Sequence, residues 1–325
     1  MEYDIIVVGG GPAGLSAAVR AAWVAAPAVT YRARVLVLDA GDAPGGLSRW
    51  QPLVMNSPGV VFTKRELKSM LRSCDLFGVE IKQGRVEALR TLESGGFEVT
   101  TADATYQCLA TVIATGCRLG HRNEHRLFHH NRVLWFHDNA TLDQVMEQLD
   151  ANDRIKSICL CGSEAVAATH QYLMKPRRVE LRTIAEPPYA EDPVPGVERG
   201  RLTLIEVDTA ADRLRLQVES MYGAIDNIEC DVLIVDFNAY QKTASSLGFL
   251  QCAPRRFANG FISTGRDMGC DVPGLFAAGD ATSTPFSVVK AMSEGTVAGF
   301  AAYAHVCALR TGTAPNLFPF FPYEI

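Results

Sequence analysis

Short apolar runs, a glycine turn and a helical segment follow one another at the start of the chain. Residues 4–8 are apolar and lead directly into the glycine-rich residues 9–14. Residues 15–26 are rich in alanine, the best helix former, and residues 34–38 form a second apolar run that ends in Asp39. The pattern predicts a strand, a turn, a helix and a second strand, which together make one βαβ unit.

The same pattern recurs in the middle of the chain. Residues 155–161 form the candidate first strand and are followed by Gly162 and Ser163. Residues 164–174 have a helical composition, and residues 179–184 form the expected returning strand. A βαβ pattern that occurs twice is typical of a protein with two Rossmann-like dinucleotide-binding domains.

Strands and one long helix are predicted for much of the remaining sequence. Residues 97–101 and 106–115 alternate like the two strands of an antiparallel ribbon. Further strand-like segments follow a proline-rich loop, at residues 202–208, 213–219 and 231–236. Residues 288–309 predict a long helix whose small residues permit close packing.

We therefore expect an α/β protein in which a second domain interrupts the first. The first domain comprises residues 1–117 and 244–325, and the inserted domain comprises residues 118–243. With 325 residues, of which 48% are hydrophobic, the chain has enough apolar material for two cores of ordinary size.

Charge and hydropathy exclude several classes of partner. A formal net charge of −5 leaves no positive surplus to hold a phosphate backbone, so we expect no nucleic acid partner. The apolar runs have the length of strands and fall far below the ~20 residues of a spanning helix. We therefore expect no membrane insertion, although peripheral contact with a membrane stays open. The chain opens directly into a strand, which favours a cytoplasmic location.

The glycines of the first turn have the spacing of a dinucleotide-binding turn. Gly9, Gly11 and Gly14 follow a G-x-G-x-x-G pattern between a predicted strand and a predicted helix, the context in which this pattern carries weight. Gly9 allows the tight turn, Gly11 lets a pyrophosphate approach the main chain, and Gly14 lets the helix pack on the strand. Asp39, at the end of the second strand, is placed to accept hydrogen bonds from a ribose.

A second segment favours FAD over NAD as the cofactor. Residues 274–280 form an apolar strand that ends in Gly279 and Asp280, just before a predicted helix. A carboxylate at this place accepts a hydrogen bond from a ribityl hydroxyl, while the helix N-terminus faces the flavin edge where reduction places negative charge. We therefore expect FAD in the first domain.

With these motifs the chain resembles the low-molecular-weight thioredoxin reductases over nearly its whole length. The matching segments are residues 9–15, 45–46, 56–59, 114–116, 259–262 and 272–280. The resemblance implies bound FAD, an inserted pyridine-nucleotide domain, a homodimer, and a protein or small-molecule thiol or disulfide as substrate. The residues expected at the FAD are Gly9, Gly11, Pro12, Ala13, Gly14, Asp39, Gly45, Gly46, Asn56, Val86, Ala114, Thr115, Gly116, Gly279, Asp280, Ser287 and Val288.

The first departure from that family concerns the second glycine turn, which binds NADPH there. In this chain Leu160 stands at the first glycine position, and Glu164 adds negative charge at the N-terminus of the predicted helix. In place of the basic cluster that takes the 2′-phosphate there is a single arginine, Arg182. We therefore expect the chain not to bind NADPH productively.

The second departure concerns the redox Cys-x-x-Cys pair. None of the nine cysteines has this spacing, and residues 135–140, where the family carries the pair, contain no cysteine. The remaining candidates are Cys159 with Cys161, which share one face of a regular strand, or Cys117 with Cys270. A disulfide between strand positions i and i+2 would be strained and oxidising, and thiols that are merely buried are the alternative. No metal site is expected, because zinc-ligand spacing is also missing.

The lost NADPH pattern makes the chain similar to a cyanobacterial subgroup, the diflavin-linked disulfide oxidoreductases, which place a second FAD beside the first. We expect an FAD-dependent thiol–disulfide oxidoreductase that is independent of NADPH, with a second flavin in the degenerate NAD(P)-type domain as an open alternative. Two other functions also stay open. One is an NADPH- or ferredoxin-linked flavin reductase with a non-disulfide acceptor, and the other is a non-catalytic, FAD-binding regulatory protein.

Overall fold

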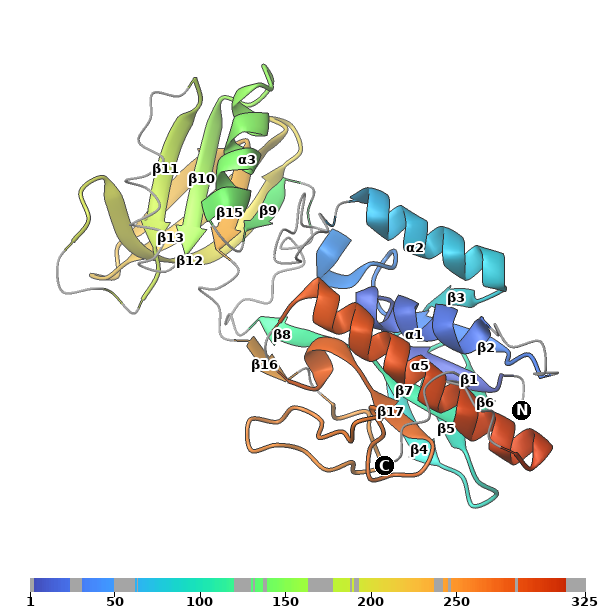
Figure 1. Ribbon diagram of the computed structural model, residues 1–325. Coiled ribbons are helices and arrows are strands. Elements are labelled where there is room, and N and C mark those ends of the chain that lie inside the picture. Colours follow the sequence, from blue (N-terminus) through green and yellow to red (C-terminus); the bar gives the residue numbers. More distant parts are fainter. Residues whose placement is uncertain are drawn as a thin grey trace. The chain divides into compact units, whose positions relative to one another are not determined.

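The computed structural model shows a chain that forms two compact units (Figure 1). It describes residues 3–23, 31–49, 62, 64–119, 130, 132–136, 139–162, 178–187, 189, 193–236, 242–244, 247–283 and 286–313. Unit 1 comprises Met1–Arg49, Asn56–Arg118 and Thr243–Ile325, and unit 2 comprises Trp50–Met55 and Leu119–Lys242. Two short strands, β8 (Cys117–Leu119) and β16 (Lys242–Ala244), pair where the chain leaves unit 1 and returns to it.

The main sheet of unit 1 is parallel and has the order β17-β7-β1-β2-β3. Its strands are β1 (Ile5–Val8), β2 (Val35–Asp39), β3 (Glu80–Gln83), β7 (Ala110–Ile113) and β17 (Leu275–Ala277). The three inner strands are buried almost throughout, as their unbroken apolar runs require for a parallel sheet that is covered on both faces. The predicted α/β architecture with parallel Rossmann-like sheets is confirmed.

The segment predicted as one ribbon strand over residues 106–115 divides into two strands that belong to different sheets. β6 (Thr105–Cys108) pairs antiparallel with β5 (Phe97–Thr101), which pairs with β4 (Val86–Thr91). β7 instead pairs parallel with β1, so the prediction is wrong for its second half. The physical reason is burial: β7 is buried at every position and needs a covered sheet, whereas β6 is largely exposed.

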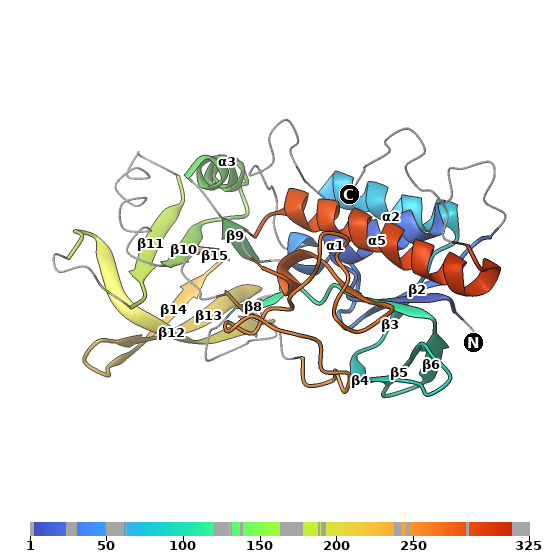
Figure 2. The ribbon, with the colours of Figure 1, turned by 60° about the horizontal axis from the view of Figure 1, so that its bottom comes forward.

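Three helices accompany the sheet of unit 1, and two of them pack unusually closely. They are α1 (Pro12–Ala22), α2 (Lys64–Phe77) and α5 (Val288–Thr311), and Figures 1 and 2 both show α1 and α5 side by side. A Cβ atom on Gly295 would lie 2.1 Å from the carbonyl oxygen of Ala13, and one on Gly299 would lie 2.3 Å from that of Ala17. The small residues predicted to permit close packing therefore do so. Among the helices that the structure describes, none is long and apolar enough to span a membrane.

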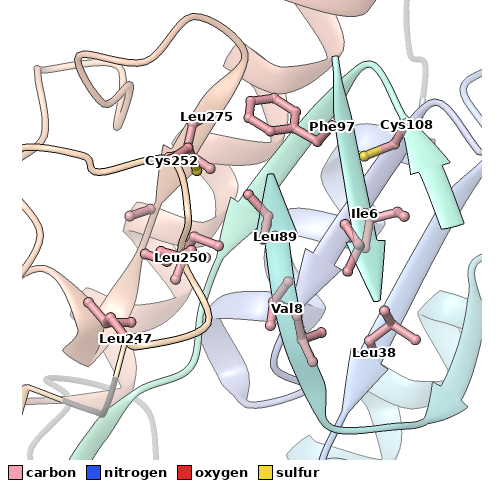
Figure 3. Close-up of a cluster of buried hydrophobic side chains, with 14 of the residues drawn as sticks. Ile6, Val8, Leu38, Leu89, Phe97, Cys108, Leu247, Leu250, Cys252 and Leu275 are labelled. Atoms are coloured by element: carbon pink, nitrogen blue, oxygen red, sulfur yellow. The ribbon is translucent and has the colours of Figure 1, made fainter. Parts of the chain in front are cut away.

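A hydrophobic cluster lies between the main sheet and the β4-β5-β6 sheet (Figure 3). Ile6, Val8 and Leu38 point into it from the main sheet, and Leu89 and Phe97 come from the smaller sheet. The alternate residue Val7 faces the other way, since it lies next to Gly14 of α1. The sheet is thus covered on both faces, which leaves the carboxyl ends of its strands as the place where a ligand can approach.

Unit 2 contains a seven-stranded sheet with the order β14-β13-β12-β11-β10-β15-β9. Its strands are β9 (Val133–Phe136), β10 (Ser157–Gly162), β11 (Glu180–Ala185), β12 (Val197–Asp208), β13 (Arg213–Ser220), β14 (Ile225–Cys230) and β15 (Val232–Asp236). Side chains of α3 (Asn139–Asp150), among them Leu142 and Met146, share a buried cluster with Ile158 and Ile234. The sequence did not predict β14, whose first three residues are exposed and which therefore has little apolar pattern.

Candidate cofactor site

The turn between β1 and α1 is formed by main chain at very short range. Gly9 has a φ of +106°, and a Cβ atom there would lie 2.3 Å from the carbonyl oxygen of Ala114. A Cβ atom on Gly14 would lie 1.8 Å from the carbonyl oxygen of Gly9. Any side chain at these two positions would force strand and helix apart, so both glycines are required by the packing.

Gly11 differs, because the space in front of it is open. Its φ of −74° suits any residue, and among the described residues a Cβ atom there would approach only Gly46 Cα, at 3.8 Å. Gly45 lies beside the same turn, because its amide donates to the Gly10 carbonyl oxygen at 2.7 Å. Pro12 occupies the first turn of α1, whose leading amides have no acceptor within the helix. The result is a cradle of main chain that suits a pyrophosphate.

Asp39, at the end of β2, holds the neighbouring main chain. Its Oδ2 accepts from the Gly10 amide, and its Oδ1 accepts from the Gly41 amide at 2.8 Å. The carboxylate predicted to bind a ribose therefore lies directly beside the glycine turn. It also stiffens that turn, because it links β2 to the middle of the G-x-G-x-x-G segment.

Two further strand ends reach the same region of unit 1. The amide of Ala114, just after β7, donates to the Val8 carbonyl oxygen at 2.8 Å. Gly116 follows with a φ of +73°, and no atom of the described residues would lie within 4 Å of a Cβ atom placed on it. After β17, Gly279 has a φ of +74°, and a Cβ atom there would lie 2.7 Å from Ala13 Cβ. The structure thus brings the returning segment against the first turn of α1, as the FAD prediction requires.

The long helix predicted over residues 288–309 begins at Val288, as the sequence indicated, and a short turn lies between Asp280 and that helix. Gly279–Ala281 form a short 3-10 turn, η4, and α5 starts at Val288. The turn closes through the Thr282 amide, which donates to the Gly279 carbonyl oxygen at 3.0 Å. Ser287 caps α5 by accepting from the Lys290 amide at 3.1 Å, so the predicted Ser287 and Val288 do mark its N-terminus.

The candidate cysteines lie in very different surroundings. The Cys117 thiol donates to Asp280 Oδ2 at 3.9 Å, which places a half-buried sulfur at the carboxylate predicted to face the flavin. Cys159 and Cys161 are fully buried in β10, and this burial raises the pKa of the Cys159 thiol well above its usual range. Cys270 packs against the hydrophobic cluster, and burial raises its pKa to about 12. Only Cys117 thus stands at the predicted cofactor site.

Of the other predicted contacts, Val86 is buried in the hydrophobic cluster and Asn56 lies outside the described residues. Sequence reasoning missed two residues of α5 that hold the η4 turn, Lys290 and Glu294. A signal was present, because these are oppositely charged residues four apart at the start of a helix made largely of small and apolar residues.

Known proteins share this fold and the glycine turn. Residues 7–64 match the family model of an NAD(P)-binding Rossmann-like domain. The thioredoxin reductase of Treponema pallidum is 26% identical over 329 residues, which cover 95% of this chain and 99% of the relative. A ferredoxin–NADP reductase of Streptococcus sanguinis is 27% identical over 129 residues, or 35% of each protein. The solved thioredoxin reductase of Streptococcus pyogenes matches with a TM-score of 0.60 at 19% identity, covering 94% of this chain and 98% of the other.

The fold, the glycine turn and these similarities define the class of protein. The chain is thioredoxin reductase-like over nearly its whole length and has a dinucleotide-binding fold, as the sequence predicted. The residues present also fit FAD. Gly11 and Gly46 leave a cradle that a side chain would fill, and Asp280 brings a carboxylate from the neighbouring strand end.

Substituting Gly11 tests the role of the cradle in FAD binding without disturbing the fold. In Gly11→Ala the new methyl group fits the apoprotein, so its stability should stay within about 1 kcal/mol of wild type. The same methyl group occupies the place of the pyrophosphate, and we expect FAD affinity to fall roughly 10- to 100-fold, the cost of overpacking one methyl group. Gly14→Ala is the matched control: its Cβ would meet Gly9 at 1.8 Å, so it should destabilise the apoprotein itself. Thermal unfolding and flavin fluorescence titration measure both quantities, and wild-type FAD affinity in Gly11→Ala would contradict the assignment.

Proposed function

We propose that this chain is an FAD-dependent disulfide oxidoreductase of the thioredoxin reductase type, whose flavin does not receive electrons from NADPH. Similarity to a thioredoxin reductase over 95% of the chain supports the class. The observation that carries the second part is the pairing of β10 with β11 in unit 2, which takes up Leu160, Cys161 and Gly162 at the start of the predicted nucleotide turn. The rest of that turn and the helix predicted over residues 164–174 lie outside the described residues.

In unit 1 the paired positions of β1 and β2 end at Val8 and Leu38, the Gly9 amide still donates to the Leu38 carbonyl oxygen at 2.8 Å, and the chain then turns through glycine. In unit 2 the corresponding ladder continues, because Leu160 pairs with Thr183 and Gly162 pairs with Ala185. Leu160 is fully buried at the first glycine position. A strand that continues through these positions has its main-chain groups engaged in the sheet, so they are not available to cradle a pyrophosphate there.

The described residues at the end of β11 itself, Ile184, Ala185 and Glu186, carry no positive charge, although Arg199 of β12 pairs with Ala185 across the sheet. Ile184 and Ala185 are fully buried, and Glu186 places a buried carboxylate next, whose Oε1 accepts from the Leu202 amide at 2.9 Å. Arg182 is already bound, because its Nη2 donates to Glu198 Oε2 at 2.8 Å and it also pairs with Asp226. These carboxylates raise the pKa of Arg182 and hold its charge in place. NADPH would have to break this pairing to gain a phosphate contact.

The same features bear on a second flavin. FAD also carries a pyrophosphate, and the main-chain groups of the paired β10–β11 strands are no more available to the pyrophosphate of FAD than to that of NADPH. We therefore propose one FAD per chain, held in unit 1. The homodimer and the cytoplasmic location expected from the sequence stay predictions.

Cys117 is the sulfur that we propose to exchange with the substrate. When bound, the flavin supplies or accepts two electrons. The Cys117 thiolate attacks a substrate disulfide, the substrate S–S bond breaks, a new S–S bond joins Cys117 to one sulfur, and the other sulfur leaves as a thiolate. Two electrons and the required protons then return the mixed disulfide to two thiols. Asp280, within 3.9 Å of the sulfur, is placed to orient the thiol.

A second candidate function is a flavin reductase with a non-disulfide acceptor. The observation that favours it is the similarity to a ferredoxin–NADP reductase over 129 residues, although this match covers only 35% of each protein. The missing Cys-x-x-Cys pair is compatible with that function as well.

Anaerobic titration of the flavin absorption band distinguishes these functions. We expect dithiothreitol to bleach the band and NADPH to leave it unchanged at equal concentration, because the described strand end of unit 2, residues 160–162, is engaged in sheet pairing. Bleaching by NADPH alone would contradict the proposal and support the flavin reductase. A band that responds to neither reagent would indicate a non-catalytic flavoprotein.

Replacing Cys117 tests the proposed sulfur. The holoprotein is photoreduced and mixed anaerobically with 5,5′-dithiobis(2-nitrobenzoate), and the return of the flavin band is followed. Cys117→Ser should keep its FAD and lose nearly all of this reoxidation, because a hydroxyl cannot form the mixed disulfide. Cys74→Ala, in which a cysteine buried in α2 is replaced, is the control and should react like wild type. Equal rates in both variants would exclude Cys117.

The flavin content decides between one site and two. Purified protein is saturated with FAD, freed of excess, and denatured, and the released flavin is measured against chain concentration. We expect one FAD per chain because the glycine cradle occurs in unit 1 alone among the described residues. A ratio of two would restore the diflavin alternative.

A further inference from the structure

Two charged side chains from α5 hold the η4 turn. Glu294 Oε2 accepts three hydrogen bonds: from the Gly279 amide at 2.9 Å, from Thr282 Oγ1 at 3.0 Å and from Lys290 Nζ at 3.1 Å. One carboxylate oxygen therefore binds the main chain of the turn, a side chain just after it and a cation on its own helix. Such charge-assisted bonds are roughly twice as strong as neutral ones.

The Lys290 ammonium group donates to carbonyl oxygens of the η4 turn and of the residues just after it. Its Nζ lies 3.0 Å from the Gly279 carbonyl oxygen, 3.0 Å from the Ser283 carbonyl oxygen and 3.2 Å from Thr282 Oγ1. The side chains of Lys290 and Glu294 are only 14% and 20% exposed, so both charges depend on these partners rather than on water. The pair is thus built into the turn and is not an ordinary surface ion pair.

Gly279 is the residue on which this arrangement acts. Its amide is bound by Glu294 and its carbonyl oxygen by Lys290, while its φ of +74° and its contact with Ala13 leave it little freedom. Asp280 is the next residue, and the direction of its side chain depends on the orientation of the Gly279 peptide. The ion pair therefore controls the carboxylate that meets Cys117.

We propose that Lys290 and Glu294 are positioning residues of the flavin site, which aim Asp280 at the ribityl chain by fixing both polar groups of Gly279. This inference rests on the proposed FAD site in unit 1. A second ion pair near the other end of α5, between Arg310 and the buried Asp4 at 2.9 Å, allows this positioning role to be distinguished from a general contribution to stability. That second pair does not contact the η4 turn and provides a matched control.

The test compares Lys290→Met, Glu294→Gln and the double variant with wild type, using FAD as the probe. Each single variant should weaken FAD binding roughly 10- to 100-fold, the range for losing hydrogen bonds to charged groups. The double variant should bind no more weakly than the worse single variant, because the two side chains act as one unit. The visible circular dichroism of the bound flavin should change in all three, since it reports the orientation of groups around the ring and ribityl chain.

The control is Arg310→Met, which should lower the melting temperature of the apoprotein while FAD affinity and flavin dichroism stay at wild-type values. Glu294→Gln is nearly isosteric, so it supplies a folded variant even if Lys290→Met unfolds. Wild-type affinity and dichroism in Glu294→Gln, or equal losses in Arg310→Met, would overturn the positioning role alone. A wild-type chain that takes up no FAD would overturn the flavin assignment and this inference together.

Discussion

The close approach of main chain around the first turn of α1 is the constraint on which unit 1 depends. Gly14 packs on Gly9, Gly9 packs on Ala114, and Gly279 packs on Ala13 from the opposite side. Gly295 of α5 closes the arrangement at the Ala13 carbonyl oxygen. Because no side chains separate these segments, the ends of β1, β7 and β17 meet at one helix N-terminus, and that convergence creates the cofactor site.

Polar side chains around this packed centre hold the turns in place. Asp39 holds the glycine turn through the Gly10 amide, and Lys290 with Glu294 holds η4 through Gly279. Each of these charged groups binds main chain, which suits a site that must present its own amides and one carboxylate to a ligand. Disturbing one such contact would move a short stretch of backbone and leave the sheet intact.

Unit 2 has a comparable parallel βαβ order of strands with a different residue at the first glycine position. Its β10 and β11 pair as β1 and β2 do, yet the ladder runs on to Gly162 and Ala185, and buried Leu160 stands where unit 1 has Gly9. At the described residues, the β10–β11 pairing of unit 2 thus reaches further along the strand than the β1–β2 pairing of unit 1. The sheet of a dinucleotide domain is thereby kept, while its residues 160–162 are engaged in strand pairing.

The sequence by itself determined the two Rossmann-like sheets, the glycine turn and the returning Gly279–Asp280 segment, because these depend on local patterns of apolar runs and glycines. It could not divide residues 106–115 between two sheets, since that choice depends on which face of each strand is covered by distant segments. Nor could it show that Cys117 meets Asp280, that Cys159 and Cys161 are sealed in a central strand, or that Lys290 and Glu294 both bind Gly279. Some of those contacts join residues that are far apart in the chain, and others join a side chain to the backbone of another element. Only the packing of α1, α5 and the strand ends decides them.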